Sequence, residues 1–236
     1  MKNLSIVTRI YILAVILIGF FLAAWGALAM DWGSPALYLL AALGAVAQTL
    51  KVEGPTNRTN YSIAWFLYGF TFIVLGLPAA IFVILVSHLV EWAWHKYPWY
   101  IQLFNIGNHI LPVSLGAVIF TSISQGRQAL NAIEAIALAG SNLVFVLTNH
   151  FLLAIVVKLA RNQSFAESGL FEFLTLFLDF TLLSMGSVTG LAWQVTPLAS
   201  LLNIPPLYLL YQALRVPALM RQISVMKKKV PDKSTT

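Results

Sequence analysis

The sequence predicts an all-α integral membrane protein, a polytopic helical bundle, on three observations. Its 236 residues are 59% hydrophobic and only 9% charged, whereas about a quarter of the residues in soluble domains are charged. Its apolar runs approach or exceed the roughly 17–25 residues that a spanning helix needs, and they lack the weak alternation of barrel strands. Its basic residues fall mostly between alternate runs. We therefore expect the chain to lie in a lipid bilayer.

Eight apolar segments follow one another along the chain. The first is too long for a signal-peptide core of about 7–15 residues and is followed by DWGSP rather than an A-x-A site, so we expect it to be retained. The third and fourth are short because Gly76 and Pro78 interrupt one apolar stretch, and a proline in mid-run breaks a helix. Two tilted spans or one re-entrant hairpin would both fit this break. The eight segments are 10–30, 34–50, 61–76, 78–95, 99–122, 135–158, 170–192 and 197–214.

The basic residues predict how the segments are oriented. Lys and Arg gather before the first segment and after the second, fourth, sixth and eighth, which places them all on one side of the membrane. The other side carries only Asp31, Arg127 and Glu134. Positive charge is retained on the cytoplasmic side, so both termini are expected to be cytoplasmic. On this side, the basic residues that precede the eighth segment are Lys2, Arg9, Lys51, Arg58, Lys96, Lys158 and Arg161.

The chain is expected to form one bundle over residues 1–220, followed by a basic tail over 221–236. The tail has too few apolar residues to fold alone. Its bases suit a solvated topology anchor or contact with anionic lipid or a protein partner, and they do not indicate nucleic acid. The chain has no cysteine and no G-x-S-x-G, H-E-x-x-H or P-loop spacing. We therefore expect neither an enzyme nor a bound cofactor.

Polar side chains recur at similar depth on three successive segments. Spacings of i, i+3 and i+4 on the fifth segment and i, i+3 and i+7 on the seventh place each set on one helix face, near the bilayer midplane. Lipid cannot satisfy such groups, so they should face the bundle interior or a wet cavity. The candidate ligand-binding residues are Asn105, Asn108, His109, Asn142, Asn149, His150, Thr175 and Asp179. Glu172 lies on the same helix face as Thr175 and Asp179 but is not among the candidates.

Several interpretations of these residues stay open. The asparagines could serve only to join helices, at about 0.6–2 kcal/mol each. Asp179 would cost about 2.5–3.5 kcal/mol at the membrane centre and therefore marks a functional site, with His109 or His150 as the expected partner. A metal site built from these three residues is chemically feasible, but no spacing requires it and we assign none; a haem lacks paired histidine spacing. His88 and Glu91, at i and i+3, are interpreted as an interfacial pair.

Three stretches resemble the multi-span N-terminal sensor domains that precede GGDEF or HD-GYP domains in bacterial cyclic-di-GMP signalling proteins. They are 62-SIAWFLYGFTFIVLGLPAAIFVILVSHLVEWAWHKYPWYIQLFN-105, 143-LVFVLTNHFLLAIVVKLARNQSF-165 and 205-PPLYLLYQALRVPAL-219. The resemblance implies a sensor of the bacterial inner membrane whose last helix leads to a cytoplasmic output. Because the sequence stops at Thr236, it further implies a module that works without its own enzyme, as a truncated product or through a protein partner.

The short third segment, its Gly-Pro break and the small-residue fourth segment also look like the S-components of energy-coupling-factor transporters. Those six-helix subunits capture a vitamin and dock on an ATPase module through small-residue faces. Gly19, Ala23, Ala24 and Ala27 form such a face, suited to packing within the chain or between the subunits of a homodimer. Three hypotheses follow: a membrane sensor that binds a small ligand or senses the membrane, a substrate-capture subunit, and a structural assembly protein.

Overall fold

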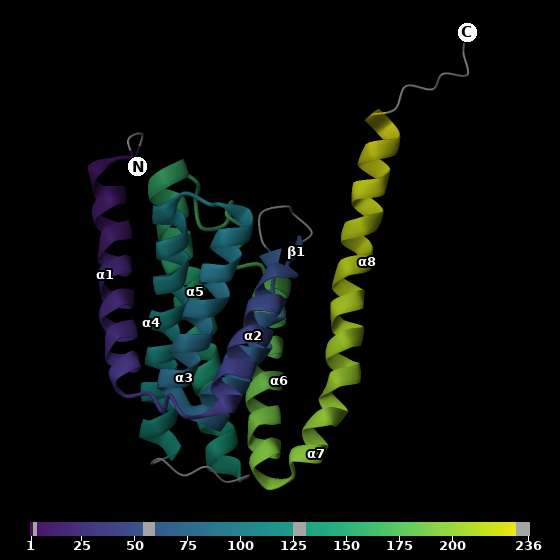
Figure 1. Cartoon of the computed structure of the whole chain (residues 1–236). Helices are drawn as coiled ribbons and strands as arrows, with labels where there is room; N and C mark the ends of the chain where they lie inside the picture. Colours follow the sequence, from purple (N-terminus) through teal and green to yellow (C-terminus); the bar gives the residue numbers. More distant parts are fainter. Residues whose placement is uncertain (2–3, 54–59, 125–130, 230–236) are drawn as a thin grey trace.

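The computed structural model describes residues 1, 4–53, 60–124 and 131–229, and within these the side chains of 53, 60, 199, 200, 217–219 and 221–229 are not described. The described chain is an all-α bundle with one two-residue β-ladder (Figure 1). Its elements are α1 (Ile6–Leu28), α2 (Pro35–Thr49), β1 (Val52–Glu53), β2 (Asn60–Tyr61), α3 (Ala64–His95), α4 (Trp99–Ser124), α5 (Ala132–Arg161), α6 (Phe173–Val195), α7 (Pro197–Ser200), η1 (Leu201–Asn203) and α8 (Ile204–Lys229).

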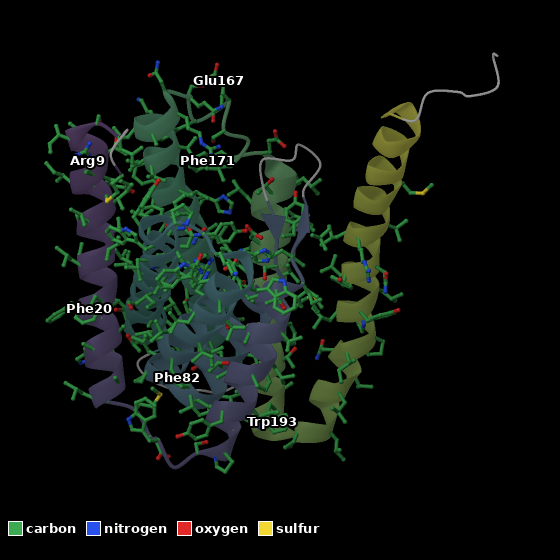
Figure 2. The ribbon with its side chains drawn as sticks, turned by 45° about the horizontal axis from the view of Figure 1, so that its top comes forward. Arg9, Phe20, Phe82, Glu167, Phe171 and Trp193 are labelled. Atoms are coloured by element: carbon green, nitrogen blue, oxygen red, sulfur yellow. The ribbon has the colours of Figure 1, made fainter. Side chains whose placement is uncertain are left out.

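Five of the described helices are long and apolar enough to cross a membrane, namely α1, α3, α4, α5 and α6, and α2 is a shorter apolar helix. Their outward faces are apolar as well. Phe20 on α1 is 73% exposed and points away from the bundle (Figure 2). Exposed aromatic and aliphatic side chains of this kind require lipid rather than water around them. The predicted fold class, a polytopic helical membrane bundle, is confirmed.

α3 is a helical hairpin rather than a rod, because the chain turns back at Gly76. Gly76 has φ +84° and ψ 179°, in a region that only glycine occupies without strain. Trp65 and His88 lie on either side of this break, and a straight helix would separate them by roughly 34 Å at 1.5 Å per residue. Their rings nevertheless both contact His109, at centroid distances of 5.7 and 4.5 Å. The chain therefore reverses at this break, as both structures that the sequence left open for this stretch require.

Pro78 begins the returning half of α3. A proline in the first turn of a helix has no intrahelical hydrogen bond to lose, and its fixed φ suits that position. The turn therefore combines a glycine that reverses the chain with a proline that starts the next helix. Both ends of α3 consequently face the same end of the bundle, and the short connection 96–98 leads directly into α4.

Close helix packing holds the bundle together at glycines. A Cβ built on Gly19 of α1 would lie 2.6 Å from the Cα of Gly107 of α4. One built on Gly186 of α6 would lie within 2 Å of the backbone oxygen of Phe66 in α3. Small residues let helix backbones approach where no hydrophobic effect drives them together. The predicted small-residue face of α1 is therefore used within the chain at Gly19, whereas Ala24 and Ala27 remain exposed.

The helix ends show which parts of the chain lie at the same end of the bundle. The N-terminal end of α1 and the C-terminal end of α8 lie at the same end in Figure 1. Arg9 and Glu167 lie at that end in Figure 2, and Phe82 and Trp193 at the other. The start of α1 and the end of α8 therefore lie at the same end of the bundle, as the distribution of basic residues along the sequence predicts.

α8 differs from the predicted eighth segment. The stretch 197–203 forms the short α7 and η1, and α8 begins only at Ile204, just before Pro205 and Pro206. It then continues through Lys229, nine residues into the stretch predicted as an unstructured tail. The reason is local propensity, since Arg, Gln, Met and Lys favour helix and the next proline comes only at Pro231.

Gly76→Ala should lower the free energy of unfolding by about 1–3 kcal/mol, because an alanine must adopt the strained positive φ of the turn. Gly140→Ala is the matched control, since a Cβ there meets its nearest atom at an ordinary 3.5 Å and alanine favours helix. Thermal unfolding in detergent micelles measures both. An unchanged midpoint for Gly76→Ala would contradict the hairpin.

Candidate functional site

An aspartate and a histidine from adjacent helices form the centre of the site. Nε2 of His150 on α5 lies 2.8 Å from Oδ2 of Asp179 on α6. The two residues are only 3% and 5% exposed. An ionised carboxylate can only accept, so the imidazole donates through Nε2. Of the two partners that the sequence offered Asp179, the structure selects His150.

His109 lies elsewhere in the same interior, against α3. Its Nδ1 lies 2.9 Å from the backbone oxygen of Asn105, one turn earlier in α4. A carbonyl oxygen only accepts, so this ring donates through Nδ1 and leaves Nε2 as its other polar atom. Its ring centroid is 6.0 Å from that of Tyr68 and 4.5 Å from that of His88.

The asparagines of α5 join helices to one another. Asn149 Nδ2 donates to the backbone oxygen of Asn108 at 2.6 Å, which ties α5 to α4. Asn142 donates to Ser184 Oγ at 3.2 Å and accepts from Ser187 Oγ at 3.3 Å, which ties α5 to α6. Asn142 is therefore partnered through both of its amide atoms, as a purely structural role requires.

His88 and Glu91 form the predicted pair, but the structure buries them inside the bundle, at 1% and 0% exposure. His88 Nδ1 lies 3.0 Å from Glu91 Oε2, and Gln48 Nε2 of α2 donates to the same oxygen at 2.9 Å. Lys51, just after α2, pairs with Glu91 Oε1. The sequence placed the pair near a membrane surface, whereas α2 and α4 cover this side of α3 and enclose it.

Gln102 of α4 completes this second cluster. Its Nε2 donates to the backbone oxygen of His88 at 2.6 Å. The sequence does carry a signal for it, since Gln102, Asn105 and His109 follow one another at i, i+3 and i+7 and so share a helix face. The polar stripe of this helix therefore begins one turn earlier than the sequence prediction placed it.

A cavity of about 180 Å³ lies between these groups. A single water needs roughly 10–15 Å³ of such space, so the cavity holds several waters or one small molecule. Seven of the eight predicted site residues line it, and Asn142 alone does not. The seven are Asn105, Asn108, His109, Asn149, His150, Thr175 and Asp179. Lining residues that the prediction missed include Gln48, Lys51, Ser62, Trp65 and His88.

Four buried polar atoms of the cavity lining have no hydrogen-bond partner within the described chain. They are His88 Nε2, Asn108 Oδ1, His150 Nδ1 and Asp179 Oδ1. Leaving a buried polar atom unpaired costs about 1–3 kcal/mol, and more when it is charged. Four such atoms around one cavity indicate that the protein's own hydrogen bonds do not complete the site.

The described residues do not bring a metal site together. No three His, Asp or Glu side chains within this part of the chain are arranged to hold an ion. His109 donates to Asn105 and lies against His88, apart from the pair of His150 and Asp179. The alternative of a metal held by His109, His150 and Asp179 is therefore not assembled.

Comparisons with family models, with curated proteins and with solved structures each give no match.

His150→Leu should lower the free energy of unfolding by about 3–5 kcal/mol, because it leaves the buried Asp179 carboxylate uncompensated. Asp179→Leu should lower it by about 1–3 kcal/mol, because it leaves a buried imidazole donor unpaired. The double variant should lose about 1–3 kcal/mol less free energy of unfolding than the two single variants lose together. Thermal unfolding in detergent micelles measures all three. Glu172→Leu, at an exposed position just before α6, is the control and should change stability little. Strict additivity of the two single variants would contradict the pairing.

Proposed function

We propose that this protein is a membrane-embedded sensory module that binds a small polar molecule in the cavity and passes its occupancy to α8. The proposal assigns no enzymatic reaction to the chain. It is supported by the resemblance to bacterial membrane sensor domains, in which the final helix leads to the output. The structural argument comes from the segment between α2 and α3.

That connecting segment contacts the cavity on one side and α8 on the other, and this observation carries the proposal. Lys51 and Ser62 line the cavity. Val52, Tyr61 and Ile63 lie against a leucine-rich face of α8. The α8 residues that face them are Leu207, Leu210, Tyr211 and Leu214. A change in the cavity therefore reaches α8 through residues that are neighbours in the chain.

Tyr61 adds a second connection between the same two places. Its hydroxyl lies 3.5 Å from Thr175 Oγ1, a residue of the cavity lining, while its side chain also borders α8. Over most of its length α8 stands clear of the other helices in Figure 1. A helix with so few contacts can change position at lower cost than one packed in the core.

Signalling by this device obeys population-shift arithmetic. Such a sensor requires two packings of the bundle, and a ligand favours one only by the difference in its affinity for them. An increase from 1% to 99% of the active packing requires about a 10⁴-fold difference. The unpartnered atoms of His150 and Asp179 supply such a difference if only one packing aligns them with the ligand.

The cavity also helps to distinguish the two other hypotheses, a structural assembly protein and a substrate-capture subunit. A structural assembly protein needs polar groups that satisfy each other, as Asn142 does, and gains nothing from unpartnered ones. A substrate-capture subunit would use the same cavity, but it does not need the connection to α8. Motion of α8 therefore separates sensing from capture.

Native mass spectrometry of the protein purified from its membrane should show a bound small molecule. Asp179→Asn should lose it, while the bundle stays folded because the amide oxygen still accepts from His150. Glu172→Gln, the same acid-to-amide change at an exposed position just before the same helix, should retain it. Absence of any bound species from the wild type would contradict the proposal.

The same preparations report on α8 by double electron–electron resonance. The chain has no cysteine, so Leu17→Cys on α1 and Tyr208→Cys on α8, both exposed, can be spin-labelled without background. The distance distribution of the otherwise wild-type protein should differ from that of the Asp179→Asn form. Identical distributions together with loss of the bound molecule would favour substrate capture over sensing.

The proposed orientation places both termini in the cytoplasm. Gly33 and Ala166 are exposed residues in connections at opposite ends of the bundle. A membrane-impermeant maleimide added to intact bacterial cells should label Gly33→Cys and leave Ala166→Cys unlabelled until the cells are lysed. The reverse pattern would overturn the orientation.

A further inference from the structure

We infer that the cavity binds a small primary ammonium ion, either ammonium itself or a short alkylamine. The inference rests on the proposed function and names the ligand class of that same site. It follows from which hydrogen-bonding atoms of the lining are already engaged and which are left over.

The donors around the cavity are largely engaged within the protein. Gln48 Nε2 donates to Glu91, Asn149 Nδ2 to the Asn108 backbone, and Lys51 Nζ to Glu91. The hydroxyl of Ser62 donates to Gln48 Oε1 at 2.9 Å. A ligand that needs donors from the protein, such as a carboxylate or a phosphate, would have to break these bonds.

Four fully buried atoms of the lining have no partner within the described chain, and two of them are side-chain oxygens. Asn108 Oδ1 and Asp179 Oδ1 can only accept, and both belong to residues at most 5% exposed. His88 donates through Nδ1 to Glu91, and His150 through Nε2 to Asp179. In a neutral imidazole the other nitrogen is an acceptor, so His88 Nε2 and His150 Nδ1 join the set. An occupant must therefore bring several N–H or O–H donors.

The hydrogen bonds of His88, His109 and His150 suit neutral rings. A protonated His150 would leave a charged N–H donor buried without a partner, which costs more than an unpaired neutral acceptor. The ring centroids of His88 and His109 lie 4.5 Å apart. Two positive charges at that separation would repel each other strongly in a buried site. The neutral forms therefore fit the hydrogen bonds that the three histidines make.

The remaining charge of the lining is negative. Lys51 and Glu91 offset each other in their ion pair. Asp179, held by a neutral histidine, then has no formal cation beside it among the described lining residues. A buried carboxylate without a counter-charge is costly, and a bound cation removes that cost. The occupant thus needs one positive charge as well as donors.

Size and the aromatic wall favour a compact cation. A primary ammonium has three N–H donors on one nitrogen, and about 180 Å³ accommodates it together with a few waters. Trp65 lines the same cavity, and an indole face attracts cations. The alkyl part of a short amine would lie against Leu153 and Leu170, the aliphatic residues of the lining.

Isothermal titration calorimetry in phosphatidylcholine nanodiscs tests the inference with methylammonium chloride. Methylammonium should bind the wild type with one site per chain. Tetramethylammonium has the same charge but no N–H donor, and it should bind at least about tenfold more weakly because the acceptors stay unpaired. This comparison uses only the unmodified protein, so it does not depend on any variant folding.

Asp179→Asn should weaken methylammonium binding by about 10- to 100-fold, the range for loss of one hydrogen bond to a charged group. Glu172→Gln should bind as the wild type does. Equal binding of tetramethylammonium and methylammonium, or no binding of methylammonium, would overturn the inference. If native mass spectrometry then shows an anionic or neutral molecule that Asp179→Asn loses, the proposed function stands and only the ligand class is wrong.

Discussion

The structure depends on one constraint, that polar groups buried in a membrane bundle must find partners inside the protein. Five of the described helices bring such groups to one place, and most of these groups are hydrogen-bonded to one another. The pair of His150 and Asp179 joins α5 to α6, and Asn149 joins α5 to α4. His88, Glu91 and Gln48 join α3 to α2. The helices can pack closely around these contacts because glycines at their crossings let the backbones approach.

The α3 hairpin determines where the polar groups meet. Had α3 been one straight helix, Trp65 and His88 would lie at opposite faces of the membrane. The reversal at Gly76 returns His88 to the depth of Trp65, beside His109. The returning half of α3 is thereby enclosed between α2 and α4, and its polar residues become part of the interior. The cavity exists because this second cluster and the pair on α5 and α6 do not fully complete each other's hydrogen bonds.

Much of this arrangement could be predicted from the sequence. Hydropathy gave the fold class, and Gly76 and Pro78 marked the break in α3. The i, i+3, i+4 and i+7 spacings identified seven of the cavity residues, because polar residues in a span have to face inward. The pairing of His88 with Glu91 was predicted, whereas its burial was not, because hydropathy reports distance along a helix and not which helices enclose it. Trp65 was missed as a lining residue because an aromatic side chain in an apolar run carries no signal of its own.

The central claim is that the cavity holds a polar guest rather than only its own hydrogen bonds. Crystallography from a lipidic phase, at a resolution that shows ordered waters, tests it most directly. The account predicts non-protein density within hydrogen-bonding distance of Asp179 Oδ1, Asn108 Oδ1 and His150 Nδ1. Side chains turned to pair with one another, around a cavity closed and without density, would contradict it.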